Sequence, residues 1–270
     1  AWVARGKQLL KGTAPVAIGA AVMGGVAFAS DDVLHPPSYP FAFKGYFTTY
    51  DAASIRRGYE VYTQVCATCH SLNLVAYRTL IDVCFTEEDV KKLTANFEVE
   101  DGPNDDGEMF ERPGKPADKF PAPYANEQQA RSINNGANPP DLSLITKARH
   151  NGQDYLFALL LGYKDPPAGV VADNAAGQYY NPYFPGGKIG MPKQLQDGGV
   201  EYTDGTPATE SQMAKDVVEF LSWAAEPEAD ERKRLGMKWM AMMIAMCALT
   251  GYYKRFRWGH LKTRKITYLR

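Results

Sequence analysis

The chain has 270 residues, a formal net charge of −1 and four cysteines. This length fits one large domain or two small ones, and the balanced charge gives no general affinity for nucleic acid. Because two of the cysteines lie in one short motif, the chain lacks the disulfide framework of a small secreted protein.

Residues 1–30 combine basic side chains with an apolar run. Arg5, Lys7 and Lys11 precede an uncharged stretch, 12–30, that is rich in Ala, Gly and Val. A basic start, an apolar middle and small residues at the end are typical of a sorting signal. The run is also long enough to cross a bilayer. Residues 1–30 are therefore either a cleavable sorting segment or a retained, second membrane helix.

A segment rich in proline and aromatic residues, 31–50, leads into the first predicted helix. Its prolines exclude a continuous helix, so we expect an extended strap on the folded body. Apolar residues then recur at helical spacing from about 52 to 65, with Asp51 or Ser54 as the N-cap. This helix leads directly into Cys66.

The motif Cys66-Ala67-Thr68-Cys69-His70 indicates the chemistry of the chain. Covalent haem attachment requires two cysteines three apart with a histidine directly after the second. Each thiol adds to one vinyl group, and His70 is then the proximal iron ligand. A redox dithiol and half a zinc site are the alternatives. A zinc site needs two more soft ligands, but the other cysteines, Cys84 and Cys247, are single and far apart.

Residues 86–111 are strongly acidic, with ten acidic side chains and two lysines. A short helix is predicted from 87 to 97, and the Gly, Pro and Asn content after Asp101 predicts a loop. This segment is either a solvated loop or, over 98–111, a docking surface for a basic partner. Opposite charge raises the rate at which such partners meet.

Residues 112–205 are mostly irregular by composition, with two predicted helices. Asp141 or Ser143 is placed to cap a helix that runs through Arg149, and a second apolar helix covers Tyr155 to Tyr163. The long connection 164–205 follows, and loops of this length are usually functional.

Two helices are predicted in the C-terminal part. Thr209 and Gln212 form a capping box for a helix that ends near 225, and Pro227 then breaks the chain. Residues 235–253 are nearly all apolar and long enough to span a bilayer. A membrane anchor is predicted there, with a buried soluble helix as the alternative.

The tail 254–270 contains seven basic residues and no acid. Positive charge stays on the side of the membrane that is not translocated. The domain that would carry the haem, 31–232, is therefore expected on the opposite side, which fits covalent haem attachment in an intermembrane or periplasmic space.

Met191 is the predicted sixth ligand of the iron. Most other methionines lie in the apolar runs, and Met109 lies in the acidic segment, where nothing apolar would cover a haem. Met191 lies on a loop between Gly190 and Pro192, free of helical geometry. His150 stays open as an alternative ligand. A His/Met pair raises the reduction potential relative to two histidines and closes the iron to other ligands, which favours an electron carrier.

Several longer motifs occur in one order along the chain: Arg56-Arg57-Gly58-Tyr59, Cys66 to His70, Asp101-Gly102-Pro103-Asn104, Pro139-Pro140-Asp141-Leu142-Ser143, Lys147-Ala148-Arg149-His150, Asn181-Pro182-Tyr183-Phe184-Pro185-Gly186, Gly190-Met191 and Trp223-Ala224-Ala225-Glu226-Pro227. From about Asp31 to its C-terminus the chain resembles the cytochrome c1 family, the c-type subunits of ubiquinol–cytochrome c reductase (the cytochrome bc1 complex).

The resemblance implies a set of haem contacts. Cys66 and Cys69 would form the thioether links to one haem c, and His70 and Met191 would be the axial ligands. Arg149, which the residues alone leave as an ordinary surface arginine, would reach a propionate. Pro140 and Tyr155 would line the haem pocket.

The resemblance also implies a fold and a function. The fold is mainly α: a c-type cytochrome domain with long irregular loops and a C-terminal transmembrane helix. The implied place is the mitochondrial inner membrane beside cytochrome b, with the haem domain in the intermembrane space and the tail in the matrix. The chain would take electrons from a Rieske iron–sulfur protein and pass them to soluble cytochrome c. It would do so as a subunit of the reductase, a translocase, without bond-making catalysis of its own.

Two other functions stay open from the residues: a membrane-tethered haem sensor and a stand-alone tethered cytochrome.

Overall fold

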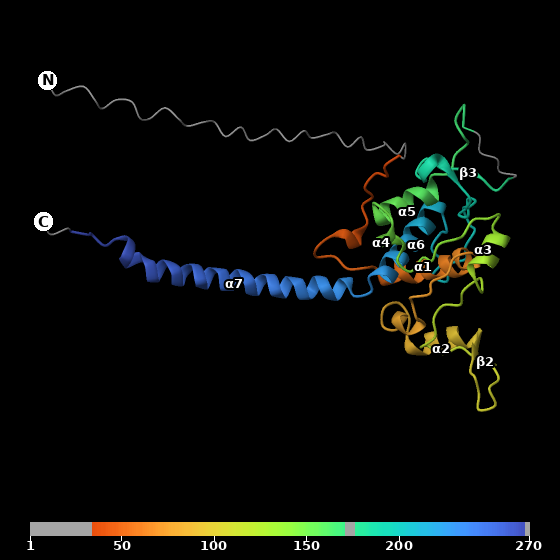
Figure 1. The fold of residues 1–270 in the computed structure, drawn as a ribbon, viewed down its shortest axis with the longest axis horizontal. Helices are drawn as coiled ribbons and strands as arrows, with labels where there is room; N and C mark the ends of the chain where they lie inside the picture. Colours follow the sequence, from red (N-terminus) through yellow and green to blue (C-terminus); the bar gives the residue numbers. More distant parts are fainter. Residues whose placement is uncertain (1–33, 171–175, 268–270) are drawn as a thin grey trace, which may run out of the picture.

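Helices dominate the structure of residues 34–170 and 176–267, which a computed structural model of the chain describes. Most of the helices gather into a globular body, and the last one leaves it as a long rod (Figure 1). The α-helices are α1 Ala52–Gln64, α2 Glu87–Ala95, α3 Glu127–Ile133, α4 Ile145–Ala148, α5 Gly152–Leu161, α6 Glu210–Ala225 and α7 Ala229–Lys262. The short 3₁₀ segments are η1 Ala42–Lys44, η2 Cys66–Thr68, η3 Tyr77–Leu80 and η5 Pro185–Gly187, and the strands are β1 Glu98–Asp101, β2 Phe110–Pro113, β3 Tyr179–Tyr180 and β4 Lys188–Ile189.

The core forms where α1 crosses α6. Gly58 permits the contact, because a Cβ at this position would lie 2.1 Å from the carbonyl oxygen of Asp216. The facing side chains are aromatic: the ring centroids of Tyr59 and Tyr62 lie 6.1 and 5.8 Å from that of Phe220. The predicted first helix is confirmed, and Asp51 is its N-cap, accepting from the amide of Ala53 at 3.0 Å. Its end, and hence the position of Cys66, is fixed by this packing.

The capping box predicted at α6 is only half formed. Thr209 accepts from the amide of Gln212 at 3.3 Å, but the side chain of Gln212 does not return to the Thr209 amide, which donates to Pro207. The Gln212 amide group donates instead to Asp216 at 2.9 Å. A buried carboxylate needs hydrogen-bond donors more than an exposed backbone amide needs an acceptor.

In the acidic segment, the short helix is predicted from the sequence, but the hairpin that follows it is not. The predicted short helix is α2, and β1 and β2 then pair antiparallel, with Asp101 opposite Phe110. Arg112 on β2 pairs with Asp101 on β1 and with Asp118, which follows the hairpin. The loop prediction is right for the tip alone, and the hairpin projects from the body (Figure 1).

The long connection 164–205 is also less irregular than predicted. Strands β3 and β4 pair antiparallel within it, and residues 171–175 are not among those described.

α7 is the one helix among residues 34–170 and 176–267 that is long and apolar enough to cross a membrane. None of its apolar stretch is buried against the body. This disagrees with the alternative prediction of a buried helix in a soluble protein. The break at Pro227 is confirmed, since α6 ends at Ala225 and α7 begins at Ala229. The helix extends beyond 235–253 at both ends, and acidic residues in its first turn and basic ones in its last fit its dipole. Residues 1–30, with the possible second membrane helix, lie outside the described part.

Candidate haem site

The cysteine–histidine motif lies at the end of α1. Helix α1 ends at Gln64, and η2 carries the chain through Cys66. The amides of Cys69 and His70 both donate to the carbonyl of Cys66, at 3.1 and 2.9 Å. This tight turn places both thiols on one loop. Both cysteines are free and half-buried, so each has a thiol with which to form a thioether.

His70 is oriented by one backbone acceptor. Its Nδ1 lies 2.8 Å from the carbonyl oxygen of Pro140. With the proton on Nδ1 donated to this carbonyl, the lone pair of Nε2 is left for a metal ion. Burial lowers the pKa of His70 against the opposing effect of this hydrogen bond. The imidazole therefore favours the neutral form that binds iron.

The segment that holds His70 is tied to the chain after the motif. The Asp141 carboxylate accepts from the Ser71 hydroxyl and from the amides of Asn73 and Ser143, each at 2.8 Å. Burial alone would raise the pKa of Asp141, but these hydrogen bonds hold it below its ordinary value. The predicted cap at Asp141 or Ser143 is therefore wrong. Helix α4 has Leu144 as its N-cap, without a side-chain hydrogen bond, because the Asp141 carboxylate is occupied by segment 71–73.

Met191 follows β4 on a loop that lies against the segment before Pro140. A Cβ added at Gly190 would lie 3.3 Å from Cβ of Ala137. The hydroxyl of Tyr163 donates to the carbonyl of Met191 at 2.9 Å. The loops that carry the two predicted axial ligands thus both contact segment 137–140.

Arg149 and His150 lie exposed in the turn between α4 and α5. Asn151 has a φ of +60°, and a Cβ at Gly152 would lie 2.6 Å from the carbonyl oxygen of Thr146, so the turn requires a residue without a side chain there. The Arg149 guanidinium donates to its neighbour's carbonyl at 3.2 Å.

Tyr155, on α5, is half-buried against the core. Burial raises the pKa of its phenol, and the positive charge of Arg149 partly offsets that shift. The charge of Arg149 therefore acts on one of the predicted pocket residues.

These features fit a haem held through two thioethers. The motif supplies two free thiols, an imidazole anchored through its other nitrogen, and a methionine loop joined to the same segment. Within the described ranges, no three His, Cys, Asp or Glu side chains gather closely enough to hold a metal ion. The zinc interpretation therefore lacks the further ligands it needs there.

A sequence model of the Cytochrome C1 family matches residues 41–261. The chain belongs to the cytochrome c1 family. It is similar to cytochrome c1-2, heme protein, mitochondrial, of Solanum tuberosum, with 59% identity over 92% of this chain and 98% of that protein. It is 55% identical to cytochrome c1, heme protein, mitochondrial, of Saccharomyces cerevisiae, over 89% of this chain and 77% of the relative. It is 53% identical to the cytochrome b-c1 complex catalytic subunit, mitochondrial, of Candida albicans, over 89% of this chain and 83% of that protein. The resemblance and the mainly α fold class are thereby confirmed.

A polar seam in this cytochrome c1 family member joins α1, the helix that leads into Cys66, to the chain after Met191. Three α1 side chains bind the segment 201–204. Gln64 exchanges two hydrogen bonds with the backbone of Glu201, at 3.1 and 3.2 Å. Glu60 accepts from the Thr203 hydroxyl at 2.5 Å, and Arg57 donates to Asp204 at 2.9 Å.

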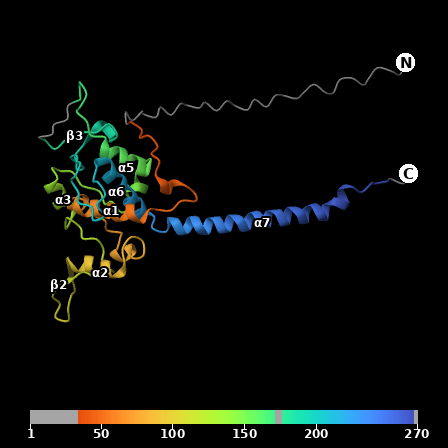
Figure 2. The same cartoon turned by 180° about the vertical axis from the view of Figure 1, so that it is seen from behind.

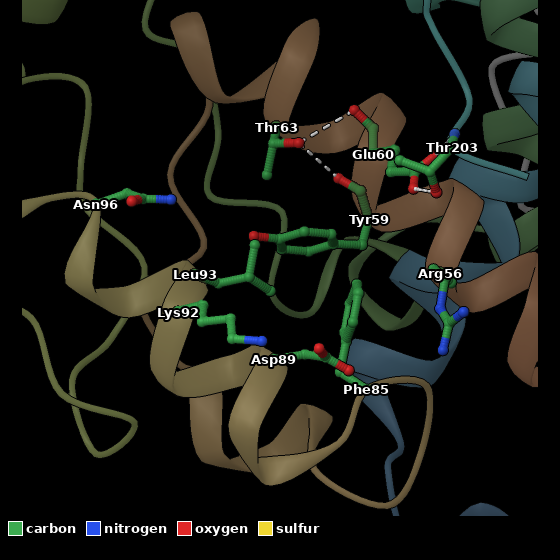
Figure 3. Close-up of a pocket in the computed structure, with 10 residues that line it drawn as sticks. All are labelled: Arg56, Tyr59, Glu60, Thr63, Phe85, Asp89, Lys92, Leu93, Asn96 and Thr203. Atoms are coloured by element: carbon green, nitrogen blue, oxygen red, sulfur yellow. Dashed lines mark hydrogen bonds between the residues drawn. The ribbon is translucent and has the colours of Figure 1, made fainter.

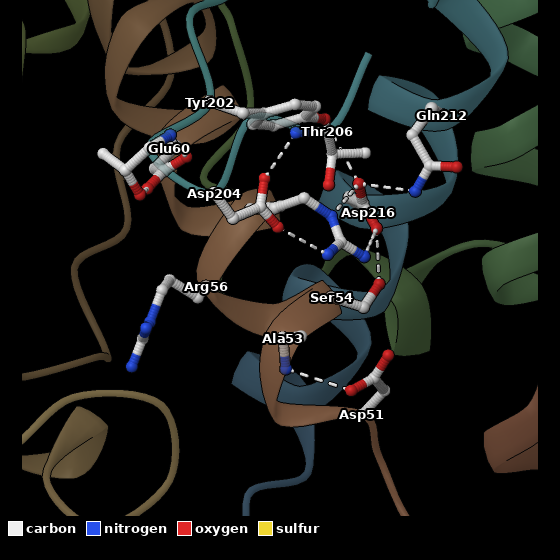
Figure 4. A network of polar contacts seen from close by, with 12 residues as sticks. Asp51, Ala53, Ser54, Arg56, Glu60, Tyr202, Asp204, Thr206, Gln212 and Asp216 are labelled. Carbon is white, nitrogen blue, oxygen red and sulfur yellow. Dashed lines mark hydrogen bonds and ion pairs between the residues drawn. The ribbon is translucent and has the colours of Figure 1, made fainter. Parts of the chain in front are cut away.

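Part of the seam is visible in Figure 4, where Tyr202 and Asp204 lie near Glu60 of α1. Sequence reasoning missed the seam. The available indication was the spacing of the three polar residues on α1, which places them on one face.

An open pocket of about 560 Å³ lies between α1 and α2. Figure 3 shows Tyr59, Leu93 and Phe85 among the residues that surround it. Arg56 donates to the carbonyl of Cys84 at 2.8 Å and covers the Phe85 ring, 5.2 Å from its centroid. None of the predicted haem contacts lines this pocket, so it is separate from the haem site.

Proposed function

We propose that this chain is the electron-transfer subunit of a cytochrome bc1 complex, with one haem c bound through Cys66 and Cys69. The proposed axial ligands are His70 and Met191. The observation that carries the proposal is the contact of His70 Nδ1 with the Pro140 carbonyl. His70 directly follows Cys69 in a motif with two free thiols, and the chain belongs to the cytochrome c1 family. A haem bound there would supply reversible one-electron exchange at its iron.

Each residue of the site has a separate part in this function. Pro140 fixes the His70 ring through its carbonyl, and such outer contacts set both the tautomer and the basicity of a ligand. The Met191 thioether favours the ferrous state and closes the sixth position. Arg149 offers a cation for a propionate. Tyr155 is half-buried beside it and excludes water from the pocket wall.

Helix α7 is proposed to anchor the chain in the mitochondrial inner membrane. Its uncovered apolar surface would contact lipid and cytochrome b. The basic tail 254–270 would stay in the matrix, which puts the haem domain in the intermembrane space. The chain would thus act within quinol–cytochrome c reductase as the electron path, without breaking or forming bonds.

The proposed electron donor is a Rieske iron–sulfur protein, and the acceptor is soluble cytochrome c. The β1–β2 hairpin supports the second assignment. Its acidic side chains are exposed apart from the half-buried Asp101, which pairs with Arg112. An acidic projection of this kind attracts a basic partner.

The spectrum of the dithionite-reduced protein with and without carbon monoxide tests the proposal. With Met191 on the iron, carbon monoxide is expected to leave the spectrum unchanged. Strong binding would contradict Met191 ligation and favour a haem sensor. Purification in mild detergent is expected to recover a b-type cytochrome with the chain, and recovery of the chain alone would favour the stand-alone cytochrome.

A further inference from the structure

Two aromatic side chains on the strap are the most exposed large apolar residues of the described chain. Tyr46 is 86% exposed and Phe47 is 84% exposed. The aromatic residues just before them are buried, with Phe41 and Phe43 at 7% and 6%. The strap therefore anchors itself with one aromatic pair and presents the next pair outward. The haem chemistry uses neither exposed ring.

The turn that carries the exposed pair is held on both sides. The Phe43 ring lies 5.3 Å from Phe41 and 4.9 Å from Tyr50 between centroids. Across the turn, the Thr48 hydroxyl donates to the carbonyls of Ala42 and Gly45, at 2.5 and 3.1 Å. The exposure of Tyr46 and Phe47 therefore belongs to a fixed turn.

This turn is joined to the start of the membrane helix. Lys233 Nζ donates to the carbonyls of Phe43 and Thr48, at 2.6 and 3.0 Å, which flank the exposed pair. The amide of Tyr50 donates to Asp230 at 3.1 Å. In both cartoon views the strap, drawn in orange, lies beside the first turns of α7 and projects in the direction in which α7 leaves the body (Figures 1 and 2). The apolar run begins only two residues after Lys233.

We propose that Tyr46 and Phe47 insert into the interfacial layer of the bilayer, on the side of the haem domain. Aromatic side chains are favoured at this depth, where apolar rings and polar groups are both accommodated. Exposed basic residues at the start of the apolar run, Arg234 and Lys238, suit anionic headgroups at the same level. The inference rests on α7 being the membrane anchor.

A lipid surface explains the pair better than a protein neighbour does. Two aromatic side chains bury about 150–250 Å² each, whereas a specific protein interface needs about 1,000 Å² in total. A lipid surface has no such requirement for shape or area.

The contact would also serve the haem domain. Only the short segment around Pro227 connects α6 to α7, and a second membrane contact would fix the tilt of the domain on its anchor.

The test uses spin labels on the full chain, in its complex, in nanodiscs of phosphatidylcholine and phosphatidylglycerol. Phe47→Cys and, separately, Tyr46→Cys are made in a Cys247→Ser background. Collision rates with oxygen, which concentrates in lipid, and with a water-soluble nickel chelate are measured by power saturation. Ile133→Cys on α3, 60% exposed and away from α7, is the aqueous control. Ile244→Cys, 67% exposed within α7, is the lipid control.

We expect labels at 46 and 47 to collide several-fold less with the chelate, relative to oxygen, than the label at 133. If the labels at 46 and 47 collided with the chelate as often, relative to oxygen, as the label at 133, while the label at 244 lay in lipid, the lipid contact alone would be overturned. Protection from both reagents would show a protein neighbour and would overturn it as well. Chelate access at 244 would overturn the anchor and this inference together, whereas the carbon monoxide test of the haem would be unaffected.

Discussion

The Arg57 guanidinium binds the fully buried carboxylate of Asp216, with 2.9 Å between Nε and Oδ2. The pair joins α1 to α6 at their crossing, beside Gly58. The same carboxylate also accepts from Ser54, Tyr202 and Gln212, at 2.6, 3.2 and 2.9 Å (Figure 4). The hydrogen bond to Asp216 is the main reason why the pKa of Arg57 is raised. Such a network stabilises a fold only while every member has its partner.

Arg57→Met should therefore lower the free energy of unfolding by about 3–5 kcal/mol, because it leaves a buried carboxylate without its cation. Denaturant unfolding of the detergent-solubilised protein, followed by circular dichroism, measures this loss. Arg131→Met breaks an exposed pair with Glu127 and should cost only about 0–1 kcal/mol. Equal losses of unfolding free energy in the two variants would show that the buried Arg57–Asp216 pair stabilises the fold no more than an exposed pair does.

Asp118 gives the protein an acid-dependent part of its stability. Hydrogen bonds from Arg112 lower its pKa from 3.8 to about 2, and both side chains are mostly buried. A lowered pKa in the folded state stabilises the fold fully above about pH 4, and this contribution is lost as the pH falls towards 2. The wild type should thus exceed Asp118→Asn in stability at pH 7, by a margin that shrinks below pH 4.

Unfolding free energies at pH 7, 4 and 3 measure this margin. Glu127→Gln, in an exposed pair, should give a small margin throughout. A margin for Asp118→Asn that stayed constant down to pH 3 would contradict the role given to Arg112.

Met191→Leu should keep the covalent haem but lower its reduction potential by more than about 100 mV, within the roughly 0.8 V range that axial ligands cover. The attachment persists because it depends on the cysteines, and the potential falls because the thioether favours ferrous iron. A redox titration measures the change. Met213→Leu is the matched control, a fully buried methionine on α6, and should shift the potential little. No change in the Met191 variant would remove Met191 from the ligand set.

The seam makes a related prediction at Gln64. Gln64→Ala removes both hydrogen bonds to Glu201, so the segment after Met191 loses one attachment to α1. We expect a weaker absorption band from the methionine–ferric bond, with the protein still folded. The conservative variant Gln64→Glu retains an acceptor for the Glu201 amide and should restore part of the band. An unchanged band in Gln64→Ala would show that the seam does not position Met191.

Local patterns predicted most of the helices and the start of the site. Helical spacing located α1, proline located the break before α7, and contiguous spacing identified the motif from Cys66 to His70. The contacts that were missed join distant residues. The sequence predicts Asp141 as a helix cap because such caps are local, yet its carboxylate also accepts from Ser71 and Asn73, about 70 residues away along the chain. The β1–β2 hairpin is not predicted, because its paired residues, such as Asp101 and Phe110, lie on either side of a tip whose composition predicts only a loop.

Neutralising the tip of the hairpin should weaken the salt dependence of cytochrome c reduction. The variant changes Asp105 and Asp106 to Asn and Glu108 to Gln, three exposed acids at the tip. Fewer charges across the encounter surface mean less screening by added salt, so the slope of rate against ionic strength should fall.

The control for this variant neutralises three exposed acids away from the hairpin, Asp82, Glu228 and Glu231, which gives the same change in net charge. Stopped-flow reduction of cytochrome c across a series of salt concentrations compares the two variants. If the hairpin docks the acceptor, the tip variant should lose more of the slope than the control, because attraction is strongest for charges within a Debye length of about 10 Å at 0.1 M salt. Equal slopes would mean that only net charge matters, and the hairpin would then be a solvated projection without a docking role.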